Sequence, residues 1–334
     1  MNEEEQVVSE NDLELDGELS LFKGKPFSGV CVDCHENGHK WKERYFKNGK
    51  HDGPFFNWYE NGNKQVEGCC KDGESDGLST VWYENGHKRM EGPYEKGLQN
   101  GCFSFWNEDG TKEKEECFRN GVKEGPHVTW YESGQKKSEG TCVDGDMDGL
   151  ITIWNENGQK IRETYSSSGQ KNGTDTVWNE NGQKETEGNY RNGVIEGVVT
   201  SWYKNGNKWT ETHYKNGISE GLCTQWYESG QKRSETFNEM GKLEGLSKHW
   251  FENGQMALEL VHRNGELVEL KEWYEDGKRR TQEEYVNGKK EGLCVEWYKN
   301  GYMKLEGIYK DGKLLETLQK RGFLENLLKS LVGR

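Results

Sequence analysis

The chain has 334 residues, of which only 31% are hydrophobic, and its formal net charge is −14. So little apolar material argues against several thick globular cores, while 13 Trp, 15 Tyr and 11 Phe exclude a disordered chain. The negative charge excludes nucleic acid as a partner and disfavours anionic membranes, because both require clustered Lys and Arg.

The first 18 residues are acidic and polar, and we expect this segment to be disordered. It lacks the basic, apolar and small-residue regions of a secretory signal, and nine cysteines are an odd number. We therefore expect reduced thiols and a cytoplasmic location. No apolar run in the chain reaches the roughly 20 residues that span a bilayer.

The segment Cys31-Val32-Asp33-Cys34 forms a C-x-x-C motif, with His35 and His39 close by. One hypothesis is a zinc site, since thiolates and imidazoles bind this metal. However, residues three apart on a strand face opposite sides of a sheet, which is poor geometry for chelation. Cysteines elsewhere replace apolar residues of the repeat described next, so we predict no metal and interpret them as small apolar side chains.

A period of 24 residues runs through most of the chain. Trp recurs at this spacing from Trp58 to Trp250, followed by Trp273 after 23 residues and Trp297 after 24, and Cys34 holds the slot before Trp58. Twelve units result. We predict an all-β fold: an elongated, solenoid-like single antiparallel sheet of tandem 24-residue β-hairpin repeats over residues 19–313, opened by an irregular hairpin with its turn at Lys23 to Pro26.

Each 24-residue repeat contains two turn signals. One follows the Trp, as in the text from Trp58 to Lys64, and the other is an Asn-Gly pair such as Asn192-Gly193. Asn-Gly favours a type I′ hairpin turn because both residues accept a positive φ. The strand between the turns alternates, so that Leu78, Thr80 and Trp82 are predicted to share one face.

Several side chains of the repeat have predicted structural roles. Successive Trp residues should lie about 10 Å apart, as a comb whose gaps admit residues of a partner. We expect the indole of a neighbouring strand to cover the Gly in the middle of the return strand. Carboxylates and lysines four residues apart should face each other as a solvated ladder rather than act as paired catalytic acids. The Gly positions are Gly68, Gly92, Gly140, Gly188 and Gly307, and the ladder pairs run from Glu60 and Lys64 to Glu228 and Lys232.

Leucines near the C-terminus follow helical spacing. The pattern predicts an amphipathic helix over roughly 315–332, within a capping segment of residues 314–334. Such a helix would block the edge of the last strand. The leucines are Leu314, Leu315, Leu318, Leu324, Leu327, Leu328 and Leu331.

The text WYENGxK joined to EGxYxNGxxxG resembles the MORN-repeat variant of bacterial YwqK-like antitoxins, over about residues 19–313. The resemblance implies an elongated array of β-hairpins that binds a protein, with an antitoxin role and no catalytic residues. The chain departs from the pattern at Cys34, at Ser166 to Ser168 and at Glu269, among other positions.

These observations predict a non-enzymatic protein-interaction scaffold without cofactor or catalytic site, with a basic protein as its partner and possible antitoxin-like neutralisation of that partner. The alternatives are a membrane-associated MORN-type scaffold and a structural protein that self-associates through its sheet edges. Aromatic side chains flanked by acidic residues suit recognition of a basic partner. The predicted binding residues are Trp82, Tyr83, Trp106, Trp130, Tyr131, Trp154, Trp178, Trp202, Tyr203, Trp226 and Tyr227.

Overall fold

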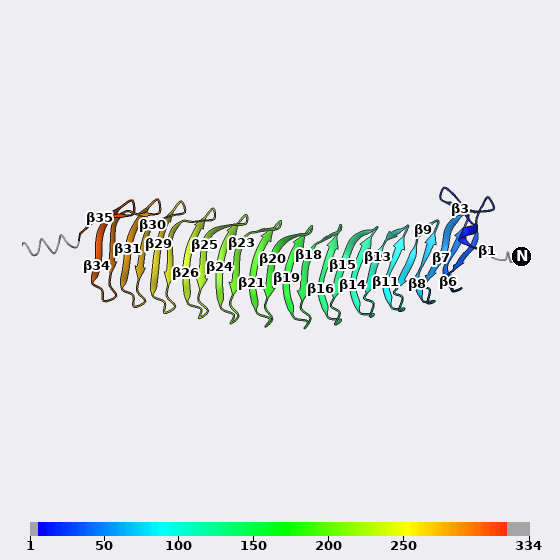
Figure 1. Cartoon of the computed structure of the whole chain (residues 1–334), viewed down its shortest axis with the longest axis horizontal. Coiled ribbons are helices and arrows are strands. Elements are labelled where there is room, and N and C mark those ends of the chain that lie inside the picture. The colour runs from blue at the N-terminus through cyan, green and yellow to red at the C-terminus, as the bar shows by residue number, and fades with distance from the viewer. Residues whose placement is uncertain (1–5, 319–334) are drawn as a thin grey trace, which may run out of the picture. The chain divides into compact units, whose positions relative to one another are not determined.

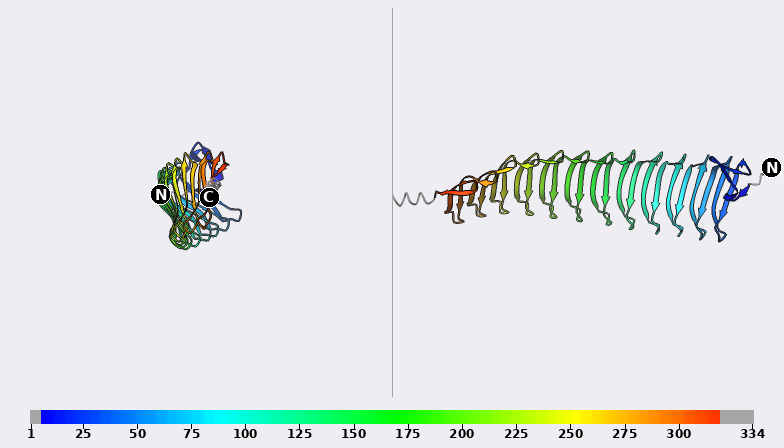
Figure 2. Two further views of the ribbon diagram at one scale, coloured as in Figure 1. Left: turned by 90° about the vertical axis from the view of Figure 1, so that its left-hand side faces the viewer. Right: turned by 45° about the horizontal axis from the view of Figure 1, so that its top comes forward.

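A computed structural model describes residues 6–318 of the chain. The chain divides into two compact units, Met1–Gln170 and Lys171–Arg334. Within each unit the strands lie side by side and follow one another in chain order, which confirms the prediction of an all-β array of tandem hairpins (Figure 1, Figure 2).

Unit 1 contains twenty elements. They are β1 (Val7–Val8), η1 (Glu10–Asp12), β2 (Glu14–Asp16), β3 (Leu19–Phe22), β4 (Lys25–Pro26), β5 (Gly29–Cys34), β6 (Lys40–Lys47), β7 (Lys50–Trp58), β8 (Lys64–Lys71), β9 (Glu74–Ser75), β10 (Gly77–Trp82), β11 (Lys88–Glu95), β12 (Leu98–Gln99), β13 (Gly101–Trp106), β14 (Lys112–Arg119), β15 (Val122–Trp130), β16 (Lys136–Val143), β17 (Asp146–Met147), β18 (Gly149–Trp154) and β19 (Lys160–Ser167).

Unit 2 continues the pattern from β20, which begins at the unit boundary. Its strands are β20 (Gln170–Trp178), β21 (Lys184–Arg191), β22 (Val194–Ile195), β23 (Gly197–Trp202), β24 (Lys208–Lys215), β25 (Ile218–Trp226), β26 (Lys232–Glu239), β27 (Lys242–Leu243), β28 (Gly245–Trp250), β29 (Met256–Arg263), β30 (Glu266–Trp273), β31 (Arg279–Val286), β32 (Lys289–Lys290), β33 (Gly292–Trp297), β34 (Met303–Lys310) and β35 (Lys313–Thr317).

The Asn-Gly turns have the predicted type I′ backbone. Asn192 and Gly193 have φ values of 50° and 78°, and the equivalent pair in the next repeat, Asn216 and Gly217, has 50° and 80°. Both residues of each pair are therefore in the left-handed region that this turn requires. The same geometry recurs at Lys96 and Gly97, where the first residue is a lysine.

The N-terminal segment is ordered from residue 6, so the prediction of disorder over residues 1–18 is wrong for its described part. Val8 packs in an apolar cluster with Phe27, Cys31 and Phe46, and Leu13 packs against that cluster. Burial of these apolar side chains stabilises the segment and offsets the entropy that the chain loses when it becomes ordered. The acidic residues of the segment provide no such compensation.

The N-terminal elements also depart from a purely antiparallel single sheet. The predicted hairpin at Lys23 to Pro26 forms as β3 and β4, but together with β2 it makes a separate three-stranded sheet beside the first strands of unit 1 (Figure 2). Strand β1 pairs with β5 in parallel, through Val7 opposite Val30 and Val8 opposite Cys31. Strand β1 thereby covers the edge of β5, as a repeat array requires at its end.

The predicted C-terminal helix is wrong where the structure can be compared with it. Residues 313–317 form strand β35, which pairs with β34 through Ile308 opposite Glu316. Backbone pairing with β34 therefore overrides the helical spacing of Leu314 and Leu315. The remainder of the predicted helix lies outside the described residues.

The glycines in the middle of the return strands are covered, but not by indoles as predicted. A Cβ on Gly92 would lie 2.2 Å from the Phe103 ring, and one on Gly188 would lie 3.2 Å from a methyl carbon of Val199. Phe103 and Val199 each stand three residues before a Trp. Because side chains alternate along a strand, the residue three positions before the Trp lies on the opposite face from the Trp and covers the Gly.

Candidate functional site

The turn after each Trp positions the side chains of the candidate surface. Gly62 N–H donates to the Tyr59 carbonyl at 2.9 Å, and Gly62 has a φ of 86°. Asn61 keeps a negative φ, so this is a type I turn with a bulge and not a second type I′ turn. The register shifts between Asn57 and Trp58, which pairs with Lys64. The bulge thereby brings the Trp and the Lys to the same face.

A Lys fills the gap between successive Trp side chains. Lys112 Nζ lies 4.8 Å from the centre of the Trp130 ring, one repeat further along the chain. A polar side chain therefore separates the indoles at these positions, and the entry of partner residues into the comb stays a prediction. The other Lys and Trp pairs within a unit are Lys40 and Trp58, Lys64 and Trp82, Lys88 and Trp106, Lys136 and Trp154, Lys184 and Trp202, Lys208 and Trp226, and Lys232 and Trp250.

The same lysines form ion pairs, but not with the carboxylates that we predicted. Lys136 Nζ lies 2.6 Å from Glu139, three residues later, and Lys64 lies 2.5 Å from Glu67. The backbone carbonyl of Glu60 instead accepts a hydrogen bond from Asn37 in the preceding repeat. The bulge at the Lys aims its side chain along the sheet, toward the carboxylate on the same face.

In six repeats a Tyr follows the Trp and links neighbouring repeats. The Tyr131 hydroxyl donates to the Trp154 carbonyl at 2.8 Å, and the Tyr227 hydroxyl donates to the Trp250 carbonyl at the same distance. These hydroxyls therefore satisfy backbone groups of the next repeat. Equivalent bonds join Tyr59 to Trp82, Tyr83 to Trp106, Tyr203 to Trp226 and Tyr274 to Trp297.

The eleven aromatic residues predicted to bind a partner are thus half-buried and serve the array itself. In unit 1 the structure places Trp82, Tyr83, Trp106, Trp130, Tyr131 and Trp154 in these ladders, and in unit 2 it places Trp178, Trp202, Tyr203, Trp226 and Tyr227 at the same repeat positions. Their role in binding stays a prediction.

A second set of side chains, which sequence reasoning did not select, is exposed in both units. Each of these residues stands four positions before a Trp and lies opposite a partner on the return strand. We call these residues and their partners the exposed row. In unit 1, Leu78 is 58% exposed, and Leu150 lies opposite Tyr165. In unit 2, Leu222 lies opposite Phe237, and Leu246 lies opposite Val261. The alternation placed Leu78 on the same face as Trp82, but it did not indicate that this side chain is exposed.

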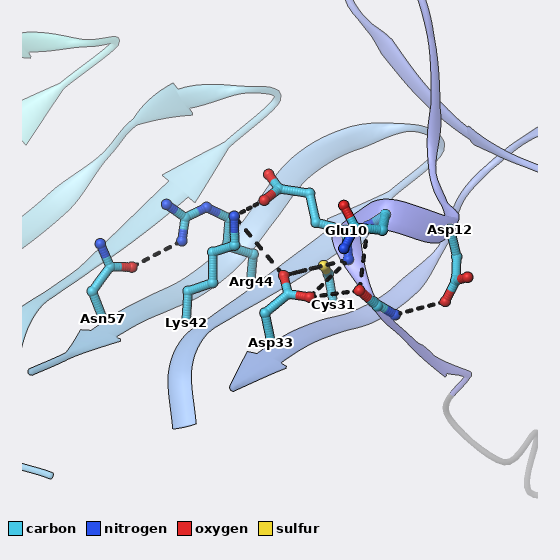
Figure 3. Close-up of polar contacts among 9 residues, drawn as sticks. Glu10, Asp12, Cys31, Asp33, Lys42, Arg44 and Asn57 are labelled. Atoms are coloured by element: carbon cyan, nitrogen blue, oxygen red, sulfur yellow. Dashed lines mark hydrogen bonds and ion pairs between the residues drawn. The ribbon is translucent and has the colours of Figure 1, made fainter. Parts of the chain in front are cut away.

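A polar cluster at the start of unit 1 includes the cysteine of the zinc hypothesis (Figure 3). The Asp33 carboxylate accepts from the Ser9 hydroxyl at 2.6 Å and lies 3.8 Å from Lys42, which also pairs with Glu10. Cys31 is 1% exposed, and burial, with the neighbouring Asp33 charge, raises its pKa to about 11. A thiol with this pKa is a poor nucleophile.

The other residues of the zinc hypothesis have surroundings that differ from those of the Cys31 thiol. Cys34 is exposed, His35 binds the Trp58 carbonyl at 2.9 Å, and His39 binds the Glu60 carbonyl at 3.0 Å. Both imidazoles therefore occupy positions that link repeats. Among the described residues no group of three or more His, Cys, Asp and Glu is arranged to hold a metal ion.

Two cysteines contradict the expectation of reduced thiols. Cys102 and Cys117 lie opposite each other on β13 and β14 and form a disulfide. Direct pairing on adjacent strands brings the two Cα atoms within 3.9 Å, so the sulfur atoms meet across the sheet. The sequence showed only that Cys102 held an apolar slot.

Comparison with known families identifies the repeat. The family model of the MORN repeat variant matches residues 75–96, 123–142, 195–216, 243–264 and 266–287. Each match covers one strand leading to a Trp and the return strand after it. The chain carries MORN-variant repeats. The comparison does not show the narrower YwqK-like antitoxin family.

Other comparisons say little about these MORN-variant repeats. No curated protein gives a significant match. The crystal structure of TcdB2-TccC3 is 10% identical, with a TM-score of 0.20, over 86% of this chain and 18% of that chain. A Tc holotoxin pore of Photorhabdus luminescens is 11% identical, with a TM-score of 0.18, over 86% of this chain and 19% of that chain. The chain thus spans less than a fifth of these structures, and scores this low carry no argument.

Two MORN-variant repeats place a buried carboxylate where others have the covered Gly. Glu116 is 5% exposed and lies 2.9 Å from Lys123 and 3.2 Å from Lys114. Burial alone would raise its pKa, but hydrogen bonds from both lysines outweigh burial and hold the pKa below its usual range. Glu283 is paired in the same way with Lys290 at 2.5 Å. Both carboxylates are engaged in ion pairs with lysines, which suits a structural role.

Proposed function

We propose that this chain is a non-enzymatic scaffold that binds a basic protein through its exposed row. MORN repeat proteins are generally interaction scaffolds and are typically not catalytic. The observation that carries the proposal is the contrast between the aromatic ladders, whose polar groups are used within the array, and the exposed row, whose apolar side chains are left in water.

The exposed row supports binding on energetic grounds. Leu222, Phe237 and Leu246 are 43%, 46% and 47% exposed, and their register places them on one face of unit 2. Burying apolar surface stabilises a complex by roughly 25 cal/mol for each Å² removed from water. Continuous exposed apolar patches on soluble proteins commonly mark interaction sites.

The charge of −14 supports a basic partner, because complementary charge accelerates encounter and disfavours acidic competitors. An antitoxin role is a narrower form of the same proposal, in which the bound protein is a toxin whose site the array occludes. A membrane-associated scaffold has less support from the charge. No helix in the described part of the chain is long and apolar enough to cross a membrane.

Affinity capture at physiological salt, followed by binding measurements with the purified candidate partner, tests the proposal. The double variant Leu222→Ser with Leu246→Ser removes apolar groups from the row of unit 2, and Leu150→Ser with Tyr165→Ser does so in unit 1. Met240→Ser is the matched control, because Met240 is 80% exposed but lies in a turn. We expect at least one double variant to weaken binding tenfold or more, while the control binds normally. Unchanged binding by both double variants would show that the row is not the site.

A further inference from the structure

Part of the exposed row in unit 2 changes from apolar to acidic side chains and back to an apolar one. Leu246 lies opposite Val261, Val261 lies opposite Glu269, and Glu269 lies opposite Glu284. Gln282 pairs with Val295, so Glu284 and Leu293, two residues further along each strand, are on the same face. Glu235 pairs with Lys248, so Phe237 and Leu246, two residues further along each strand, are on the same face. We call these six residues the acid-centred row.

The two carboxylates at its centre face each other across adjacent strands. Like charges directly opposite on one face of a sheet are destabilising. Lys271 lies 2.8 Å from Glu269 and offsets one of the charges. Glu284 is exposed, and no ion pair to it is found among residues 6–318. Repulsion between the two carboxylates therefore destabilises the free chain, and a cationic group from a partner would relieve this repulsion.

The apolar groups on either side limit what kind of partner fits. Phe237 and Leu246 lie on one side of the acidic pair and Leu293, which is 40% exposed, lies on the other. A partner must therefore present apolar, basic and again apolar groups in line. The line runs across the strands, on the face of the sheet and not at its edge, so pairing with an extended peptide strand cannot supply this contact.

The spacing of the row favours a helix lying across the strands. Adjacent strands are about 4.8 Å apart, close to the 5.4 Å pitch of an α-helix, so one side chain per turn can meet one strand. From β26 to β33 the row takes five strand steps. This corresponds to roughly 24 Å, the length of a helix of about 16 residues.

We propose that the acid-centred row binds an amphipathic helix of another protein that has apolar side chains at both ends of one face and Lys or Arg in the middle. The proposal rests on the proposed function, since it names the class of partner for the same surface. The net negative charge of the chain adds long-range attraction for such a helix. Glu269 and Glu284 set the position of the basic residues of the helix.

A synthetic 16-residue helical peptide with leucines in its first and last turns and two lysines between them on one face is the probe. A second peptide has two glutamates in place of those lysines, and a third has the composition of the first in scrambled order. Binding to the full chain is measured by fluorescence anisotropy at physiological salt. We expect the lysine-centred peptide to bind at least tenfold more tightly than either control peptide.

Variants of the chain locate the contact. Glu269→Gln with Glu284→Gln should weaken the lysine-centred peptide at least tenfold, and Leu246→Ser with Leu293→Ser should do the same. Glu266→Gln is the control, because Glu266 is exposed at the start of β30 and lies off the row. Glu284→Lys should improve binding of the glutamate-centred peptide. Equal binding of both peptides, or no effect of the row variants, would overturn the proposal.

One further outcome assigns the row to a different occupant and also overturns the proposal. If the row variants abolish a concentration-dependent dimer seen by sedimentation, a second copy covers it. Failure of the peptide while the row variants still abolish capture of a protein would reject only the helical partner and leave the proposed function standing.

Discussion

Lys112 and Trp130 belong to successive repeats, yet the lysine ammonium lies 4.8 Å from the centre of the indole ring. The same ammonium pairs with Glu115 three residues later. One side chain thus contacts its own strand and the next repeat, and the stability of a repeat array depends on such contacts between neighbours.

Replacing this lysine should weaken the array locally. We expect Lys112→Met to destabilise the chain by about 0.5–1 kcal/mol, because a partly exposed cation–π contact and an exposed ion pair are both lost. Lys112→Arg should retain most of the stability. The measurement is the urea midpoint followed by Trp fluorescence, with Lys47→Met on the exposed end of β6 as control. Equal effects of the two Lys→Met variants would argue against the ladder.

The tyrosine hydroxyls give a second test of the links between repeats. Tyr131→Phe removes only the hydroxyl that donates to the Trp154 carbonyl, and it should cost about 1 kcal/mol because a half-buried carbonyl loses its partner. Tyr165→Phe, at a residue that is 48% exposed, should change stability little. Thermal unfolding of both variants decides, and a silent Tyr131→Phe would remove the structural role.

Covered glycines should differ in their tolerance of a methyl group. Gly92→Ala forces a Cβ to within 2.2 Å of the fully buried Phe103 ring and should destabilise by about 1–3 kcal/mol. Gly188→Ala meets Val199 at 3.2 Å and should cost less. Adding Phe103→Val to Gly92→Ala should recover part of the loss. Calorimetry of the four proteins measures this order, and the reverse order would contradict the packing.

The disulfide should contribute to stability under oxidising conditions. Cys102 and Cys117 are 15 residues apart, and closing a loop of that length stabilises by up to about 3 kcal/mol through the unfolded state. We expect dithiothreitol to lower the urea midpoint of the natural chain. The double variant Cys102→Ser with Cys117→Ser should start at the lower midpoint and show no response. A response of that variant to the reductant would point to other cysteines.

The stability of unit 1 should fall in mild acid because of His51. Burial against Phe46, with ring centres 4.3 Å apart, and the charge of Arg44 lower the pKa of this imidazole. The unfolded chain therefore binds the proton first, so stability is complete above the ordinary pKa of about 6.5 and is lost as the pH falls below it. His51→Gln should flatten stability between about pH 7 and pH 5. NMR titration of His51 provides the direct check, and an unshifted curve would refute the cause.

The hairpin array could be predicted because its signals are local. Asn192-Gly193 requires a type I′ turn whatever surrounds it, and the 24-residue recurrence of Trp repeats the same short unit. The family resemblance rested on the same text, and the five matched segments confirm its MORN-variant part. Position within a repeat was therefore readable without knowledge of the contacts between repeats.

The candidate site could not be predicted to the same degree, because it depends on contacts between repeats. A bulge of one residue decides that Lys112 fills the gap before Trp130, and the register between β11 and β13 decides that Phe103, not an indole, covers Gly92. The sequence shows that Leu222 is apolar and periodic, but not that the described residues of unit 2 leave it 43% exposed. Period and turn chemistry belong to neighbouring residues and are determined by the sequence itself; exposure and the partner of each side chain depend on strand register and bulges, which only the tertiary structure decides.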